Sequence, residues 1–93
     1  MKPPVYQWDK LKQEANLARH GVDFSAVYDF DWTSAIEIED DRRDYGEIRW
    51  LALGFIGSRL HVLVYTMRGQ AIRVVSLRRA NLRERKDYDQ AQA

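Results

Sequence analysis

Residues 48–77 read IRWLALGFIGSRLHVLVYTMRGQAIRVVSL, and this stretch determines the class of fold. It consists of three apolar segments separated by Gly57-Ser58 and Arg68-Gly69, two pairs that favour tight hairpin turns. A segment before it alternates apolar with acidic residues, as a half-buried strand does. We therefore predict an antiparallel sheet of four strands, over residues 34–39, 48–56, 60–66 and 71–77.

Two-residue turns would also fix the register of the three longer strands. Leu53 would then lie opposite Val62, on a face that the helices cover. The residues expected on this helix-covered face are Leu51, Leu53, Phe55, Leu60, Val62, Val64, Val75 and Leu77. The opposite face would combine aromatic rings, hydroxyls and guanidinium groups from Trp50, Arg59, His61, Tyr65, Ser76 and Arg78. A slip of one residue in either turn would exchange the two faces.

A first helix is predicted between Asp9 and Gly21. Asp9 is a suitable N-cap, because its carboxylate accepts backbone N–H groups, and Gly21 tolerates the left-handed exit from a helix. The spacing predicts a buried stripe formed by Leu11, Ala15 and Ala18. It also predicts a neighbouring polar face formed by Lys12, Asn16 and Arg19.

Two further helices complete the expected fold. A shorter one should start after Asp23 and carry Phe24, Val27 and Tyr28, and a final one should span about residues 80–89. The final helix is charged nearly all round, so only Leu82 and Tyr88 could anchor it. The sequence therefore predicts a single α+β domain over residues 1–93, in which residues 1–7 form a flexible or extended start.

Composition excludes several classes of protein. The 93 residues are 45% hydrophobic and contain no cysteine, which excludes disulfides and a cysteine-based zinc site. The mean hydropathy is −0.57, there is no apolar run long enough for a membrane span, and MKPPVYQWDK lacks the apolar centre of a signal peptide. We therefore expect a cytoplasmic protein. Two distant histidines and scattered glycines predict neither a metal nor a nucleotide cofactor.

The net charge of +1 conceals a strong segregation of charge. Residues 37–47 read EIEDDRRDYGE and are mostly acidic, whereas residues 71–88 read AIRVVSLRRANLRERKDY and are strongly basic. Arginine stays charged at neutral pH and its planar fork matches phosphate oxygens, so the basic segment indicates a phosphodiester partner. The alternatives are that the last helix is a solvated surface helix, or that the two segments neutralise each other.

Two groups of residues are candidates for a functional site. Cleavage of RNA without a metal needs a base for the 2′-hydroxyl, cations around the phosphate and a proton for the leaving oxygen. His61, Ser76 and Arg78 could share these tasks, while Trp50 and Tyr65 could stack bases. The alternative is that His61 is an ordinary strand residue and that the aromatic rings pack under the last helix.

The second group is Glu47, Arg49 and Arg73. Glu47 and Arg49 share a face of their strand by their spacing, and Arg73 is expected near the same end of the sheet. This group could hold a phosphate or form a simple ion pair at the sheet's edge. His20, next to Gly21, is explained as a favourable cation at a helix C-terminus.

Three segments together resemble the BrnT family of toxins from bacterial type II toxin–antitoxin pairs. They are WDKLKQEANLARHGVDFSAVYDF (8–30), DYGEIRWLALG (44–54) and VYTMRGQAIRVVSLRRANLRERKDY (64–88). The resemblance covers the chain from Trp8 to Tyr88. Val75 and Leu77 depart mildly from the commoner isoleucine and alanine of the family pattern.

This resemblance implies a RelE-like fold with two N-terminal helices, a four-stranded antiparallel sheet and a C-terminal helix. It also implies a metal-independent endoribonuclease that arrests growth and is neutralised by a ribbon–helix–helix, DNA-binding antitoxin of the BrnA type, through which operator DNA is contacted. The expected catalytic residues are Glu47, Arg49, Arg73, Ser76 and Arg78, with Glu47 or His61 carrying the proton. The expected RNA contacts are Lys12, Trp50, His61 and Arg79. Two alternatives stay open: a module that binds without chemistry, and an inactive toxin relative that acts as a co-repressor.

Overall fold

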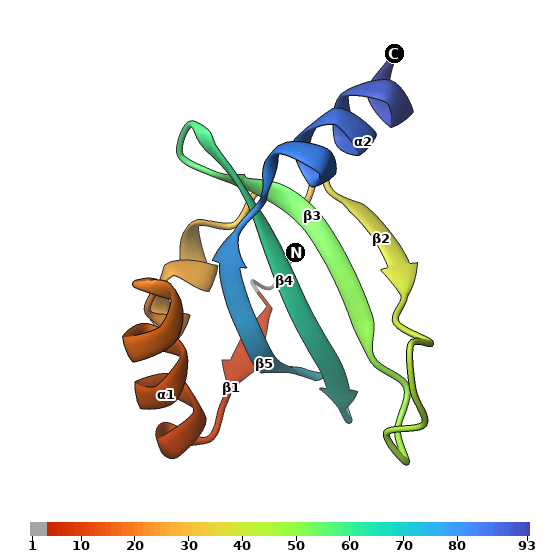
Figure 1. Cartoon of the computed structure of the whole chain (residues 1–93). Helices are drawn as coiled ribbons and strands as arrows, with labels where there is room; N and C mark the ends of the chain where they lie inside the picture. Colours follow the sequence, from red (N-terminus) through yellow and green to blue (C-terminus); the bar gives the residue numbers. More distant parts are fainter. Residues whose placement is uncertain (1–3) are drawn as a thin grey trace.

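A five-stranded sheet forms the centre of the protein (Figure 1). The computed structural model describes residues 4–93. Its strands lie in the order β1-β5-β4-β3-β2, with β1 parallel to β5 and every other pair antiparallel. Two α-helices and one short 3₁₀ helix accompany the sheet. The elements are β1 (Val5–Gln7), α1 (Lys10–His20), η1 (Phe24–Asp29), β2 (Ile36–Glu39), β3 (Trp50–Ile56), β4 (Arg59–Arg68), β5 (Ala71–Arg79) and α2 (Leu82–Gln92).

The α+β class is confirmed, but two details of the predicted fold are wrong. The sheet is mixed and has five strands rather than four, because residues 5–7 pair in parallel with the start of β5. Three residues are too few for a period-2 pattern to reveal a strand. The N-terminal region holds one α-helix rather than two. The second predicted helix is the six-residue 3₁₀ helix η1, which ends when Phe30 bridges to Ile56. Residues 1–3 of the predicted start lie outside the described residues.

The predicted register of the β3–β4 hairpin is confirmed. Gly57 and Ser58 form its turn, Gly57 has a φ of +62°, and Leu53 lies opposite Val62. The second turn lies one residue later than predicted, at Gly69 and Gln70, because Arg68 still pairs with Ala71. A β-bulge then interrupts the β4–β5 ladder: Tyr65 pairs with Val74 and Val64 with Ser76, which leaves Val75 without a partner on β4.

In β3 and β4 the two faces of the sheet are exchanged relative to the prediction, whereas in β5 Leu77 lies on the helix-covered side and Ser76 and Arg78 on the other, as predicted. The face that α1 and η1 cover, here called the core face, contributes Ala52, Leu63, Tyr65, Val74 and Leu77 to a cluster with Val22, Phe24, Val27 and Phe30. Leu51, Leu53, Phe55, Val62 and Val64 lie on the opposite side, here called the second face. Both faces of β3 and β4 are apolar, so polarity alone could not identify the helix-covered side. Gly54 marks the helix-covered side, because the Phe30 ring packs directly against it and a Cβ there would lie 2.4 Å from Cζ of Phe30.

Helix α1 also faces the sheet with the side opposite to the one predicted. Asp9 and Gly21 cap it as expected. Its buried residue, however, is Asn16, which is 7% exposed, whereas Leu11 is 74% exposed. The Asn16 amide replaces a neighbouring strand: its Nδ2 donates to the Leu77 carbonyl at 2.7 Å, and the Leu77 N–H donates to its Oδ1 at 3.2 Å. The polar face therefore docks on the edge of β5, where β1 no longer covers it.

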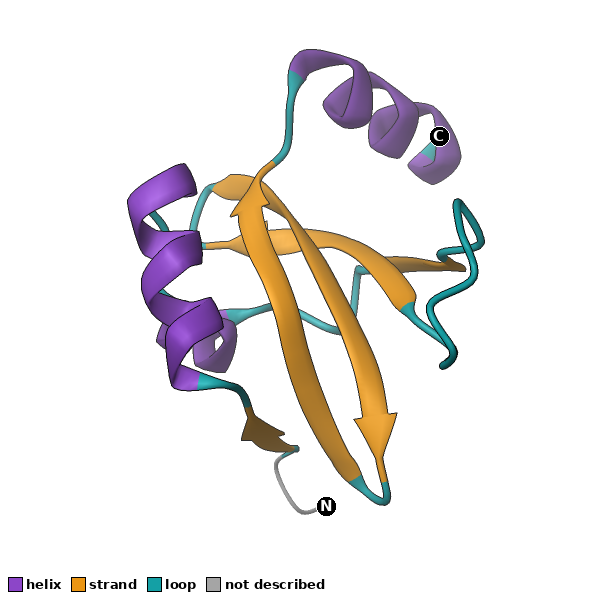
Figure 2. Cartoon of the chain, turned by 60° about the horizontal axis from the view of Figure 1, so that its bottom comes forward, coloured by secondary structure: helices purple, strands orange, loops and turns teal. Residues whose placement is uncertain are grey.

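Helix α2 lies across one end of the sheet, away from α1 (Figure 2). Asn81 and Glu84 close its N-terminus with a capping box. Tyr88 packs edge-on against Phe55, and its hydroxyl donates to the Ser34 carbonyl at 2.8 Å. Leu82, the other predicted anchor, is exposed. Tyr88 is therefore the buried apolar anchor of this charged helix, at the end of the second face where Phe55 lies.

Candidate functional site

The β-bulge brings three candidate residues of β5 onto the second face. Arg73 lies opposite Thr66, Ser76 opposite Val64 and Arg78 opposite Val62. In a regular strand Arg73 and Ser76 would point to opposite faces, because they are three residues apart. The extra residue, Val75, shifts the alternation of side chains by one position, so that Arg73 and Ser76 point to the same face. Ser76 thus lies between two guanidinium groups whose backbone positions are about 13 Å apart along the strand.

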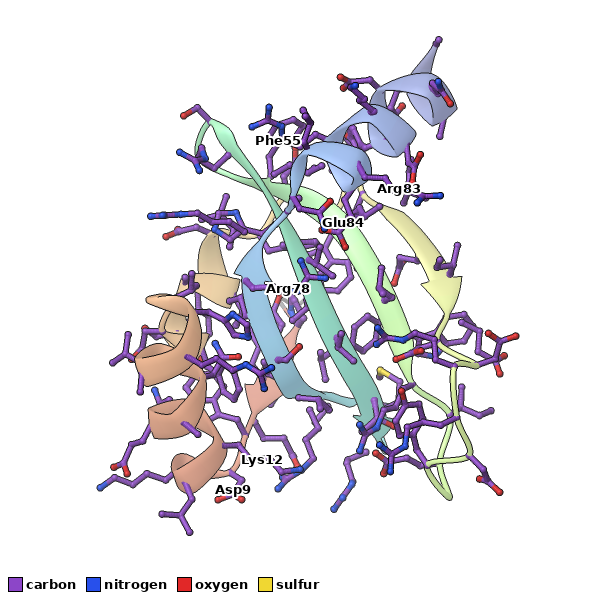
Figure 3. All side chains as sticks on the ribbon, in the orientation of Figure 1. Asp9, Lys12, Phe55, Arg78, Arg83 and Glu84 are labelled. Carbon is purple, nitrogen blue, oxygen red and sulfur yellow. The ribbon has the colours of Figure 1, made fainter. Side chains whose placement is uncertain are left out.

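Arg78 is held by the first turn of α2 (Figure 3). Its Nη1 and Nη2 each donate to a carboxylate oxygen of Glu84 at 2.8 Å. Glu84 is fixed in turn, since its Oε1 also accepts the Asn81 backbone N–H at 2.9 Å. The paired guanidinium lowers the pKa of Glu84, and the carboxylate raises the pKa of Arg78. The two-pronged pair sets the orientation of Arg78 over the sheet.

Arg73 has a neutral partner instead. Its Nη1 donates to Oε1 of Gln7 on β1 at 3.2 Å. Among residues 4–93, no carboxylate lies within ion-pair distance of Arg73, since the salt bridges there join Arg42, Arg49 and Arg78 to their acids. The charge of Arg73 is therefore available to an anion from solution.

Glu47 and Arg49 lie in the loop that leads into β3. Arg49 donates from Nε to Oε2 of Glu47 at 3.0 Å, and its guanidinium carbon stacks 4.1 Å from the centre of the Tyr45 ring. The Thr66 hydroxyl donates to the Ile48 carbonyl at 2.7 Å. Because Thr66 pairs with Arg73, the loop lies at the Arg73 end of the strands, as the sequence predicted. Glu47 and Arg49 therefore lie at the Arg73 end of the strands, and Ser76 and Arg78 follow Arg73 along the same face of β5.

A second ion pair in the same loop was not predicted. The Asp40 side chain is 1% exposed and accepts from Nε and Nη2 of Arg42 at 2.7 and 2.9 Å. These bonds lower the pKa of Asp40 to about 2. The charge of Arg42 also contributes, after their own ion pair and desolvation, to the pKa shifts of Arg78 and Glu84. Among the missed residues only Glu84 left a signal, the capping-box spacing Asn81-x-x-Glu84.

The structure does not bring the predicted histidine and aromatic residues to the second face. His61 is 6% exposed on the core side of the sheet opposite Arg79, and its Nδ1 lies 2.9 Å from the Arg59 carbonyl. Burial lowers the pKa of His61. Trp50 packs against the core cluster, and Tyr65 donates from its hydroxyl to Glu37. Roles for these residues and for Arg79 in RNA contact stay predictions.

Lys12, the remaining predicted RNA contact, lies on α1 beside the edge of β5. It lines a pocket of about 220 Å³ together with Ser76 and residues Ala15, Asn16, Arg19, His20 and Val75. Among residues 4–93 no group of three or more histidine, aspartate or glutamate side chains is arranged to hold a metal ion. No helix in the described part of the chain is long and apolar enough to cross a membrane.

Comparisons with known proteins identify the family and agree with the fold. Residues 8–84 match the family model described as the ribonuclease toxin BrnT of a type II toxin–antitoxin system. The 1.1 Å crystal structure of the Brucella abortus ribonuclease toxin BrnT superposes with a TM-score of 0.68 at 28% sequence identity, and the match covers 85% of this chain and 99% of that one. No curated protein sequence matches significantly. The family match spans most of the chain, so this protein belongs to the BrnT family of ribonuclease toxins of type II toxin–antitoxin systems.

Proposed function

We propose that this toxin cleaves RNA without a metal ion and that the second face of the sheet is its active site. The observation that carries the proposal is the placement of Arg73, Ser76 and Arg78 along one face by the bulge in β5. Two guanidinium groups flanking a hydroxyl can neutralise the charge of a phosphate that would otherwise need a cation. Arg73 contributes an unpaired charge, and Arg78 a charge of fixed orientation.

The proposed reaction is attack of an RNA 2′-hydroxyl on its own 3′-phosphate. The O2′–P bond forms, the P–O5′ bond breaks and the leaving O5′ takes a proton from water, so that the products are a 2′,3′-cyclic phosphate and a 5′-hydroxyl. Negative charge builds on the non-bridging oxygens as the phosphorus becomes five-coordinate, and Arg73 and Arg78 would stabilise it there. We assign removal of the 2′-hydroxyl proton to Glu47, which is exposed at the Arg73 end, rather than to the buried His61.

The family supports proposals about the partner and the location. A ribonuclease toxin of a type II pair should act on RNA and be neutralised by a protein antitoxin, and we propose that this antitoxin is a ribbon–helix–helix protein of the BrnA type that alone contacts operator DNA. We also propose that the toxin acts in the cytoplasm, where its RNA substrate lies. Co-expression with a ribbon–helix–helix protein encoded next to its gene tests the partnership, since a cognate antitoxin should restore growth and co-purify with the toxin.

Cleavage itself is tested with purified protein, RNA and excess EDTA. Wild-type protein should give fragments that end in a cyclic phosphate. Arg73→Ala and Arg78→Ala should each lower the cleavage rate about a hundredfold or more, the usual effect of removing a group that stabilises the transition state. Arg59→Ala removes the same charge from an exposed position outside the site and should cleave normally. RNA that stays intact with wild-type protein, or full growth arrest by folded Arg78→Ala, would contradict the proposal.

A further inference from the structure

The groove between α1 and the edge of β5 carries charge that the fold itself does not use. Lys12 and Arg19 line it, and neither forms an ion pair within residues 4–93. They stand one helical turn before and after Asn16, whose amide is fully occupied by backbone groups. Asn16 thus anchors the helix and turns both cations toward the strand. A helix that turns its cations toward a strand edge without acidic partners leaves them free for an anion.

The size and lining of the groove suit a single phosphate group. Its volume is about 220 Å³, and the small Ala15 side chain leaves the space between the two cations open. Ser76 lines the groove from the β5 side, and His20 lines it at the end nearest to the helix C-terminus. Hydroxyl and cationic donors around a small open space are what a phosphate oxygen needs.

The groove is continuous with the proposed active site. Ser76 lines the groove and also lies between Arg73 and Arg78 on the second face. The charge of Arg78 reaches His20, since together with desolvation and Arg19 it lowers the pKa of that histidine. A single strand of RNA that crosses the edge of β5 at Ser76 would therefore meet both sets of cations in succession.

We propose that this groove binds a phosphate of the RNA next to the one that is cleaved, through Lys12, Arg19 and the Ser76 hydroxyl. The proposal rests on the proposed function, because it takes the second face as the place of cleavage. It gives α1 a role in holding substrate, separate from the chemistry on β5.

The test measures binding of a short single-stranded RNA of mixed sequence in which every sugar is 2′-O-methylated. Such an RNA cannot be cleaved by its own 2′-hydroxyl, so binding is measured without turnover. Lys12→Ala and Arg19→Ala should each weaken binding about tenfold or more, as loss of a charged contact does. The slope of log affinity against log salt should become less steep by about 0.7, the value for one phosphate contact on a single strand.

Lys10→Ala is the matched control. Lys10 lies in the same turn of α1 as Lys12 but outside the groove, so its removal should change binding by no more than about twofold. Equal affinities and equal salt slopes for Lys10→Ala and Lys12→Ala would overturn the proposal. So would variants that bind RNA normally and lose the antitoxin, because the groove would then hold an acidic protein segment. Failure of wild-type protein to cleave unmodified RNA counts against the proposed function alone, since this binding assay needs no cleavage.

Discussion

Replacing Asn16 with alanine should destabilise the protein by about 3 kcal/mol, although the side chain lies on a helix and carries no charge. The change removes both donors and the acceptor that serve Leu77 and Val22. The buried N–H and C=O of Leu77 then lose their partners, at about 1–3 kcal/mol each. The higher helix propensity of alanine returns about 0.5 kcal/mol of this. The expected loss is a large part of the stability of a small domain.

Urea unfolding followed by tryptophan fluorescence measures this difference. Glu14→Ala is the control, since Glu14 is exposed on the same helix and its removal should change the free energy of unfolding by no more than about 0.5 kcal/mol. Asn16→Asp keeps the acceptor for the Leu77 N–H but puts a carboxylate against two carbonyl oxygens, so it should regain stability on acidification. A loss below about 1 kcal/mol for Asn16→Ala would refute the idea that an amide side chain closes the edge of β5.

Two further predictions concern the core and the α2 capping box. Gly54→Ala should cost about 1–3 kcal/mol in urea unfolding, because the new Cβ would overlap the Phe30 ring, and Phe30→Leu in the same chain should recover part of that loss; additive losses would contradict the contact. Glu84→Gln should be less stable than wild type at neutral pH, by an amount that shrinks in acid. The folded-state pKa of Glu84 is lowered, so its contribution is complete above 4.5 and is lost as the pH falls through the folded-state value; a pH-independent difference between the two unfolding curves would rule out the ion pair as its cause.

The sequence predicted the elements of this fold better than it predicted which side of each element is buried. Asp9, Gly21 and Gly57 are local signals. As predicted, α1 begins after Asp9 and ends at Gly21, and the β3–β4 hairpin turns at Gly57. Burial depends on the partner element, which local signals do not contain. In α1 the apolar stripe through Leu11 indicated a helix docked by hydrophobic contact. The backbone N–H and C=O of Leu77 at the edge of β5 need hydrogen-bond partners, and Asn16 supplies them. This need outweighs burial of Leu11, because a buried amide without a partner costs more free energy than an exposed leucine.

The exchanged sheet faces have a similar origin. Strands β3 and β4 are apolar on both sides, so the two-residue turn gave their register correctly but left the choice of face to contacts from elsewhere in the chain. Phe30 makes that choice, because its ring fits only against a strand position without a side chain, which is Gly54. The pair is separated by more than twenty residues in the sequence. No pattern within a single strand could have revealed it.

The bulge had the largest consequence for the site, and it too was invisible in the sequence. With regular alternation, Ser76 and Arg78 shared a face with His61 and Trp50, while Arg73 stood apart. One unpaired residue at Val75 moves Ser76 and Arg78 to the side of Arg73 and leaves the histidine in the core. The family resemblance already placed these polar residues in common motifs, but it could not say that they share a surface. Bulges often re-aim side chains next to active sites, and here the irregularity itself identifies the face on which cleavage is proposed.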